Sequence, residues 1–166
     1  MGKEIACILA TAFILTTICV VATAVMTDGY AMDTTIDPEY VAYCEEIGKQ
    51  YNIQPELLEA IIERESGGQP DVGNTAGCYG LMGISAKWQA DRMKKLGVTD
   101  LYDPYSNILV GTDFLRELFE KYEDPALVLD YYGGWEGSRR GEAYINGILE
   151  RSRQLEILHQ KILAKG

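Results

Sequence analysis

Histidine and cysteine, the usual ligands of zinc, are scarce in this sequence. It contains a single histidine, His159, and four cysteines, Cys7, Cys19, Cys44 and Cys78. The cysteines are too far apart for the close pairs of a zinc site, and His159 stands alone in a predicted C-terminal helix. The sequence therefore predicts no metal site.

Positive charge is also scarce. Fifteen lysine and arginine residues stand against 25 aspartate and glutamate residues, which gives a net charge of −10 at pH 7. A domain this acidic lacks the basic surface that binds DNA or RNA, so the sequence excludes nucleic acid as a partner. It would also gain little from long-range attraction to anionic cell-wall polymers, so binding to such a polymer has to come from a cleft.

Patterns typical of β-strands are nearly absent. Only a stretch near residues 79–85 alternates, and the chain has no repeats and no low-complexity tracts. Helical spacing of apolar residues predicts helices that begin at Pro38, with Asp37 as N-cap, and at Pro55. Further helices are predicted at about 86–96 and 106–122, from Pro125, and over 141–164. The predicted fold class is all-α (at most mainly helical α+β), with one compact domain over residues 38–166 behind a linker at 28–37.

Charge is missing altogether from one N-terminal segment. Residues 5–26 contain neither a charged residue nor a proline, and a helix of that length would span about 33 Å, enough to cross a bilayer. Lys3 precedes the run and acidic residues follow it, which favours an inside N-terminus and an outside domain. Residues 1–27 are thus predicted to be an uncleaved membrane anchor with an extracytoplasmic domain. The alternative is a cleaved signal peptide, with cleavage near 22–24 or 29–31 and secretion to the cell wall.

Two cysteines, Cys44 and Cys78, fall in the predicted exported part. An even number of cysteines outside the membrane permits a disulfide, which would join the first helix of the domain to the loop after residue 65. Two free, buried thiols are the alternative, and the sequence does not decide between them.

Glu65 lies on an apolar helix face. At about 100° per residue, Leu58, Ile61 and Ile62 form one stripe, and Glu65 falls within it. The other three glutamates of the helix, at 56, 59 and 63, are predicted to face solvent. A carboxylate in apolar surroundings has a raised pKa and can donate a proton near neutral pH. A terminal glutamate that turns out to water is the alternative, and periodicity alone leaves both open.

Several motifs carry a family resemblance. They are residues 65–68 (Glu-Ser-Gly-Gly), 70–71 (Pro-Asp), 80–82 (Gly-Leu-Met), 103–108 with Gly111, 124–132 and Tyr144. In this order, they resemble the lytic transglycosylase (SLT-type) domain of the goose-type lysozyme-like superfamily. The resemblance covers roughly residues 39–155 and implies a lysozyme-like fold that cleaves the glycan strands of peptidoglycan.

The resemblance also implies roles for particular residues. Glu65 would act alone, first as acid and then as base, without a metal or a cofactor. Hydrolysis by paired carboxylates would need a second acidic residue, and neither Asp71 nor Asp91 has a persuasive setting for that role. Substrate-binding roles are predicted for Ser66, Tyr79, Leu81, Met82, Gly83, Tyr131, Tyr132 and Tyr144, with Tyr131 replacing Tyr132 if the helix register slips. The expected partners are peptidoglycan strands, the membrane through the N-terminal segment, and unidentified components of the cell envelope.

Two positions depart from the family pattern. Gly83 stands where the family usually has glutamine, and Gly133 where it usually has asparagine. Each lost amide would remove a hydrogen bond to sugar, worth about 1–3 kcal/mol if left unmade. Two alternatives to the lytic transglycosylase therefore remain: a hydrolytic goose-type muramidase, and a non-catalytic glycan-binding or scaffold module of an envelope complex.

Overall fold

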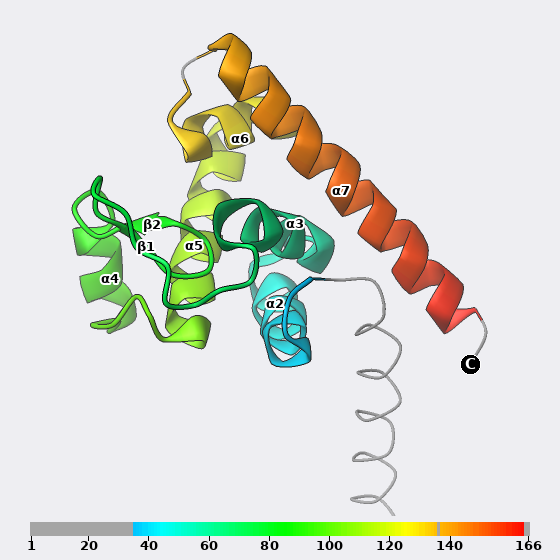
Figure 1. Ribbon diagram of the computed structural model, residues 1–166, viewed down its shortest axis with the longest axis horizontal. Helices are drawn as coiled ribbons and strands as arrows, with labels where there is room; N and C mark the ends of the chain where they lie inside the picture. Colours follow the sequence, from blue (N-terminus) through cyan, green and yellow to red (C-terminus); the bar gives the residue numbers. More distant parts are fainter. Residues whose placement is uncertain (1–34, 136, 165–166) are drawn as a thin grey trace, which may run out of the picture.

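The computed structural model describes residues 35–135 and 137–164. This part of the chain contains six α-helices and one two-stranded ribbon (Figure 1). In chain order they are α2 (Pro38–Tyr51), α3 (Pro55–Ser66), β1 (Cys78–Tyr79), β2 (Ile84–Ser85), α4 (Ala90–Leu96), α5 (Pro104–Lys121), α6 (Pro125–Gly133) and α7 (Arg139–Leu163). The predicted mainly helical fold is confirmed for these residues.

Aspartate–proline pairs start three of the helices. Asp37 accepts a hydrogen bond from the Glu39 N–H at 2.8 Å, which confirms its predicted role as N-cap of α2. Asp103 caps α5 and Asp124 caps α6 in the same way, each followed by proline at the first helical position. The carboxylate satisfies an N–H that has no partner within the helix, and proline has no such N–H to satisfy.

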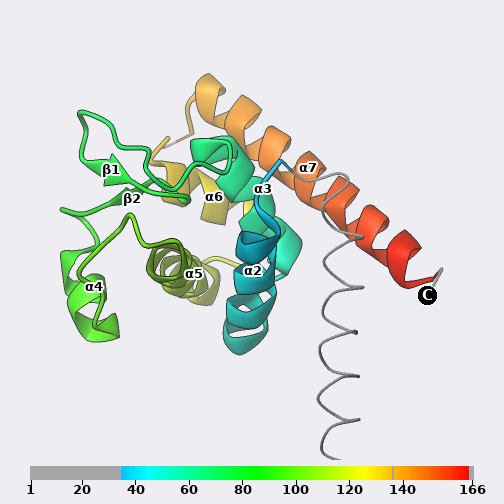
Figure 2. The same ribbon diagram turned by 60° about the horizontal axis from the view of Figure 1, so that its bottom comes forward.

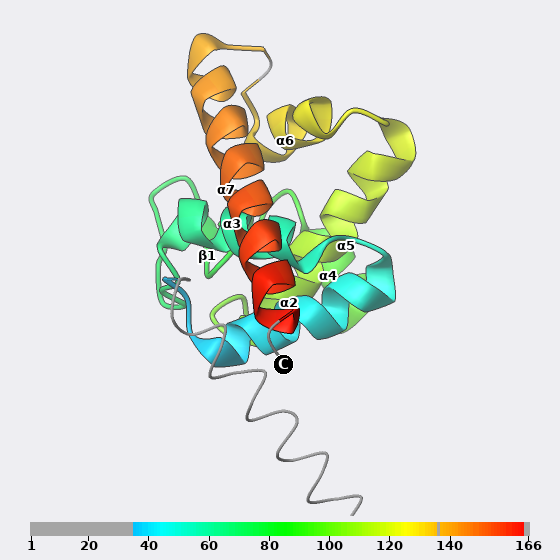
Figure 3. The same ribbon diagram turned by 90° about the vertical axis from the view of Figure 1, so that its right-hand side faces the viewer.

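Helix α3 lies in the middle of the molecule. It packs against α2 and α7, while α5 packs against α2 and α6. Figures 1 and 2 show α7 along one side and the ribbon with α4 on the opposite side. Figure 3 looks onto α7, with α3 behind it. Because α3 is covered from both sides, Leu58, Ile61 and Ile62 are completely buried.

The ribbon is a short antiparallel pair in which Cys78 faces Ser85 and Tyr79 faces Ile84. The possible strand near residues 79–85 is thus two strands of two residues each, and residues 80–83 form the turn between them. The helix predicted at about 86–96 starts later, at Ala90, because residues 86–89 form turns.

The segment 1–27 and most of the linker 28–37 lie outside the described residues, so the predicted anchor or signal peptide is not tested. Within the ranges 35–135 and 137–164, no helix has both the length and the apolar character needed to cross a bilayer.

The predicted exposure of three glutamates on α3 is wrong. Glu59 is completely buried, Glu56 contacts His159 at 2.8 Å, and Glu63 pairs with Arg151 at 2.6 Å. Helix α7 supplies both partners, because it covers the α3 face that the residue pattern assigns to solvent.

The disulfide that the sequence permits between Cys44 and Cys78 is not formed. Both Cys44 and Cys78 are free thiols. Cys44 is completely buried in the core on α2, whereas Cys78 lies half-buried on β1 and lines a surface cleft. The two residues therefore belong to different environments: both thiols are free, as in the alternative, but only Cys44 is buried.

Candidate active site

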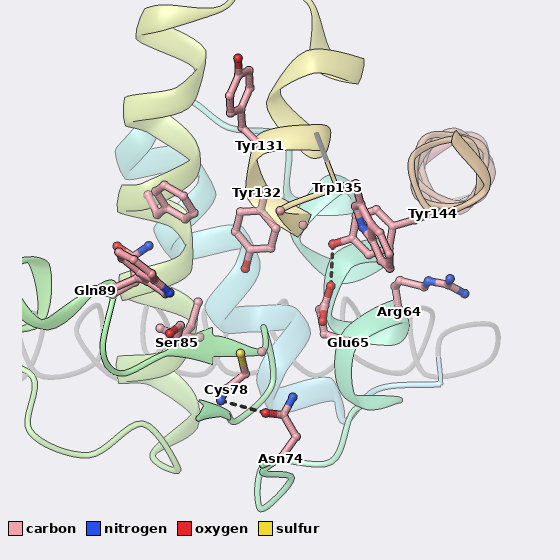
Figure 4. Close-up of a pocket in the computed structure, with 16 residues that line it drawn as sticks. Arg64, Glu65, Asn74, Cys78, Ser85, Gln89, Tyr131, Tyr132, Trp135 and Tyr144 are labelled. Atoms are coloured by element: carbon pink, nitrogen blue, oxygen red, sulfur yellow. Dashed lines mark hydrogen bonds between the residues drawn. The ribbon is translucent and has the colours of Figure 1, made fainter. Parts of the chain in front are cut away.

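A cleft of about 520 Å³ opens beside the C-terminal end of α3. The ribbon, α5, α6 and α7 also contribute to its walls (Figure 4). Its lining residues are Arg64, Glu65, Asn74, Cys78, Gly83, Ile84, Ser85, Trp88, Gln89, Phe114, Tyr131, Tyr132, Gly133, Gly134, Trp135 and Tyr144. Figure 4 shows Glu65 and Tyr144 on one side of the cleft, Ser85 and Gln89 on the other, and Tyr132 between them.

Glu65 points into this cleft from the last turn of α3. The helix ends directly after it, because Gly67 adopts a left-handed conformation (φ +61°) that favours glycine. The Tyr144 hydroxyl on α7 donates a 2.5 Å hydrogen bond to Glu65 Oε1. The helix face thus places the carboxylate at the cleft, and α7 fixes its orientation.

Burial raises the pKa of Glu65 above its ordinary value of 4.5. The hydrogen bond from Tyr144 and the charge of Arg64 act in the opposite direction and stabilise the carboxylate. Burial and the nearby Glu65 charge also raise the pKa of Tyr144, so its phenol keeps its proton. Glu65 can therefore exchange a proton while Tyr144 remains a donor.

Removal of the Tyr144 hydroxyl tests this electrostatic balance. Tyr144→Phe is expected to raise the pKa of Glu65, because the hydrogen bond that stabilises the carboxylate is lost. The alkaline limb of the pH–rate profile should move to higher pH, since an acid catalyst loses activity as it deprotonates. The rate of the reaction that Glu65 catalyses should also fall about tenfold, as expected for the loss of the hydrogen bond between Tyr144 and Glu65. Tyr43→Phe is the control, because it removes a hydroxyl that is hydrogen-bonded to Glu39 on α2; its pH–rate profile should match that of the wild type. If the profile of Tyr144→Phe also matched, Tyr144 would not stabilise the Glu65 carboxylate.

The loop between β1 and β2 forms the floor of the cleft, and a buried amide holds it. Asn107 on α5 accepts a hydrogen bond from the Met82 N–H at 2.8 Å. Its side-chain nitrogen donates to the carbonyls of Tyr79 (2.9 Å) and Leu101 (2.8 Å). A side chain at Gly80 would collide with Asn107, so glycine is required for this approach. The loop backbone is thereby fixed relative to α5.

Gly83 brings the same loop against Glu65. Its φ is +62°, and a Cβ atom there would lie 2.7 Å from Glu65 Oε2. The Glu65 carboxylate thus occupies the space into which a side chain at position 83 would extend. This geometry gives a physical reason for glycine where the family pattern has glutamine.

Gly83→Ala is accordingly expected to be damaging. The left-handed conformation should lower the free energy of unfolding by about 1–2 kcal/mol, and the methyl group should displace the carboxylate and reduce any Glu65-dependent activity at least tenfold. Gly97→Ala is the matched control, because Gly97 has a φ of +71° with no atom near its added Cβ. It should show the same loss of stability by urea denaturation with full activity. Equal activity in the two variants would show that a side chain at position 83 does not disturb the Glu65 carboxylate.

Tyr132 and Tyr131 occupy different parts of the cleft. The Tyr132 hydroxyl points inward and donates to the Met82 carbonyl at 2.8 Å. Tyr131 is exposed at the rim, where its ring stacks on Tyr122 with centroids 4.4 Å apart. The helix register therefore directs Tyr132 toward Glu65.

The Transglycosylase SLT domain family matches residues 42–148, well over half of the chain. The chain belongs to this family. One relative, named transglycosylase, from Enterobacteria phage PRD1, is 38% identical over 86 residues, which cover 51% of this chain and 31% of that protein.

Two further relatives are bacterial. Both are named endo-type membrane-bound lytic murein transglycosylase A: that of Citrobacter koseri is 31% identical and that of an Enterobacter species 29% identical, each over 112 residues. These matches cover 58% of this chain and 55% of each relative. The chain thus spans between about a third and half of the length of the curated relatives it matches.

Four of the residues that the SLT resemblance singled out for substrate binding do not line the cleft. Leu81 and Met82 are completely buried, and Met82 reaches the cleft floor only through its backbone. The Ser66 hydroxyl donates to the Ile62 carbonyl and accepts from the Gly68 N–H, so it stabilises the end of α3. The Tyr79 ring packs edge-on against Tyr102. Their substrate-binding roles remain predictions.

Several cleft residues were not singled out in the sequence. Trp88 is 78% exposed beside the cleft, and Phe114 stacks against Tyr132 with centroids 5.5 Å apart. Trp135, in contrast, belongs to the aromatic residues in the second half of the sequence that suit a saccharide cleft, and it packs beside Tyr144. Trp88 precedes α4 and Trp135 follows α6, so helical periodicity gave no signal for either.

Glu65 is the only carboxylate among the described residues that line the cleft. Asp71 and Asp91 are exposed elsewhere. Across the described ranges, no group of three or more histidine, cysteine or acidic side chains could hold a metal ion. The side chains of the cleft thus suit an acid–base reaction by one carboxyl group.

Proposed function

We propose that this protein is a peptidoglycan lytic transglycosylase. It cleaves the β-1,4 bond between N-acetylmuramic acid and N-acetylglucosamine and leaves a 1,6-anhydro ring. The observation that carries the proposal is Glu65, a half-buried carboxyl group that is hydrogen-bonded to Tyr144 and is the only carboxylate among the described residues of the cleft. Membership of the SLT family and the two murein transglycosylases among the relatives support this choice of substrate.

The reaction needs one group that acts first as acid and then as base. Protonated Glu65 gives its proton to the glycosidic oxygen as the bond from that oxygen to C1 of muramic acid breaks. The carbonyl oxygen of the sugar's own acetamido group bonds to C1 and stabilises the positive charge. The C6 hydroxyl then attacks C1 and displaces the acetamido oxygen, and its proton returns to Glu65. No water is consumed, so a second carboxylate to activate water is not required.

The neighbouring groups assist in identifiable ways. Burial favours the protonated form of Glu65 at the start, whereas Tyr144 and Arg64 stabilise the carboxylate formed in the first step. Tyr144 also fixes the direction in which the carboxyl group faces. Tyr132 and the backbone at Met82 and Gly83 form the floor of the cleft, on which the sugar would lie.

Muropeptide analysis tests the proposal. The full chain is incubated with purified peptidoglycan, and the released fragments are weighed by mass spectrometry. Fragments with 1,6-anhydro ends, lighter by one water than hydrolysis products, are the expected result. Reducing ends would instead identify a hydrolytic muramidase. Absence of release, combined with sedimentation of folded protein with peptidoglycan, would identify a non-catalytic glycan-binding module.

The same proposal places the domain outside the cytoplasmic membrane, where peptidoglycan lies. The N-terminal segment would hold it at the membrane as an anchor, or would be removed on secretion to the wall. The names of the two bacterial relatives, which include the words membrane-bound, are consistent with an envelope location.

A further inference from the structure

Two glycines form a slot for the ring of Trp135. A Cβ atom at Gly133, the last residue of α6, would lie 2.5 Å from both Cδ1 and Nε1 of Trp135. A Cβ atom at Gly141 in the first turns of α7 would lie 2.6 Å from Trp135 Cβ. Neither distance is possible for real atoms, so any side chain at 133 or 141 would force the indole out. The slot therefore depends on glycine at both positions.

The indole nitrogen of Trp135 is buried without a hydrogen-bond partner among the described residues. An indole N–H can only donate, so an acceptor oxygen is the partner that would satisfy it. Buried donors are nearly always paired, and each exception calls for an explanation. Trp135 Nε1 is one of a few such exceptions among the described residues, and it belongs to a residue that lines the cleft.

Trp135 also lies next to the groups assigned to catalysis. Its ring packs at 5.7 Å (centroid to centroid) from Tyr144, whose hydroxyl donates to Glu65. In Figure 4, Trp135, Tyr144 and Glu65 are neighbours on the same side of the cleft. A sugar positioned for protonation by Glu65 would therefore lie within reach of Trp135.

We propose that Trp135 is a saccharide-binding residue whose indole N–H donates to an oxygen of the sugar held against Glu65. Acetamido carbonyl and hydroxyl oxygens are the acceptors that an N-acetylated sugar presents. The Trp135 side chain is partly exposed while its nitrogen is covered, so a tilt of the ring toward the cleft brings the N–H to the ligand. The inference rests on the proposed function, because it takes the occupant of the cleft to be a glycan.

The proposal explains why position 133 is glycine: its lack of a side chain leaves room for the ring of Trp135. An asparagine at this position would collide with the indole, so an amide at 133 and the ring of Trp135 exclude one another. In this chain the indole N–H supplies the donor that an amide side chain at 133 would otherwise provide.

Binding without turnover tests the proposal directly. Glu65→Gln protein is titrated calorimetrically with the tetrasaccharide of β-1,4-linked N-acetylglucosamine, with and without the additional change Trp135→Phe. Phenylalanine keeps an aromatic ring beside Tyr144 and removes the N–H donor together with part of the indole ring. The dissociation constant is expected to rise about five- to tenfold, which is the loss of one hydrogen bond to a neutral group. Tyr105→Phe, which removes a hydroxyl bonded to Glu46 far from the cleft residues, should leave binding unchanged.

Thermal stability separates a binding role from a structural one. Removal of an unpartnered buried donor relieves its desolvation cost, whereas the smaller ring loses packing contacts; because the two effects oppose each other, the Tm of Trp135→Phe should change little while its affinity falls. A lower Tm with unchanged affinity, or an affinity within twofold of the parent, would overturn the proposal. Absence of any tetrasaccharide binding by the parent would overturn it too.

A double variant tests whether an amide at position 133 can replace the indole N–H of Trp135 as the hydrogen-bond donor. Gly133→Asn with Trp135→Ala places an amide in the vacated slot and should bind the tetrasaccharide more tightly than Trp135→Ala alone. Equal affinities would contradict the exchange. These measurements are independent of cleavage: if the wild-type protein binds but never cleaves, the transglycosylase proposal fails while the role of Trp135 is still measured.

Discussion

Glu65→Gln should abolish the release of muropeptides, with a loss of about 10³–10⁴-fold, at the upper end of what one acid–base group contributes. The effect is large because the same carboxyl group gives a proton in the first step and takes one in the second. Glutamine has nearly the same shape and keeps an oxygen that can accept from Tyr144, so the cleft geometry should persist. The measurement is the initial rate of release from purified peptidoglycan.

The control for this variant comes from the same helix. Glu59→Gln also replaces a buried carboxyl group by an amide, but Glu59 faces α7 and does not line the cleft. It should retain the wild-type rate, and circular dichroism should show both variants to be folded. Undiminished release by Glu65→Gln would remove Glu65 from the mechanism.

The second large effect concerns stability and centres on Glu59. Burial, followed by repulsion from neighbouring carboxylates, raises the pKa of Glu59 to about 8. Both of its oxygens lack a hydrogen-bond partner within the described part of the chain, and His159 Nε2 lies 3.9 Å away, too far for a hydrogen bond. The titratable groups around it are Cys44 and Glu45 on α2, Glu56 and Glu63 on α3, and Arg151 and His159 on α7. Glu59 is thus protonated in the folded protein at neutral pH.

The pH dependence follows from proton linkage. In the unfolded chain Glu59 has an ordinary pKa near 4.5, so between about pH 4.5 and 8 the folded state binds more protons than the unfolded state. The contribution of Glu59 to stability is therefore fully present below pH 4.5 and is lost as the pH rises toward 8. Glu59→Gln should remove this loss and raise the free energy of unfolding at pH 8 by about 3 kcal/mol, with little change at pH 5.

Urea denaturation at pH 5 and pH 8 measures the effect, and the difference between wild type and variant at each pH isolates Glu59 from other titrating groups. Glu142→Gln is the control, because Glu142 is exposed on α7. It should change stability little at both pH values. A Glu59→Gln protein that loses stability between pH 5 and pH 8 as steeply as wild type would show that Glu59 is already ionised in the fold.

Local patterns predicted the helices well. The Asp124-Pro125 pair marked the start of α6, and Asp37 was identified as an N-cap, because these signals involve only adjacent residues. Helix α5 begins at Pro104, two residues before its predicted start at 106. The apolar stripe on α3 also placed Glu65 on the buried side. The exposure of Glu59 was mispredicted because an amphipathic pattern identifies one apolar face, and α7 covers a second face with polar partners such as Arg151.

The cleft was predicted less completely than the helices. Glu65, Tyr132 and Tyr144 come together as expected, since each lies on a helix with a readable register. Trp88 and Trp135 lie outside the helices, where periodicity carries no information. Whether such a residue lines a cleft depends on the packing of distant elements, as with Gly133 and Trp135.

The three hydrogen bonds of Asn107 also affect the thermodynamics of binding. The loop between β1 and β2 is tied to α5 through Met82 and Tyr79 before any ligand arrives. The conformational entropy of this backbone is therefore lost during folding and is not lost again on association. A ligand that rests on the floor of the cleft meets a surface already in its bound conformation, so more of the contact energy is retained as affinity.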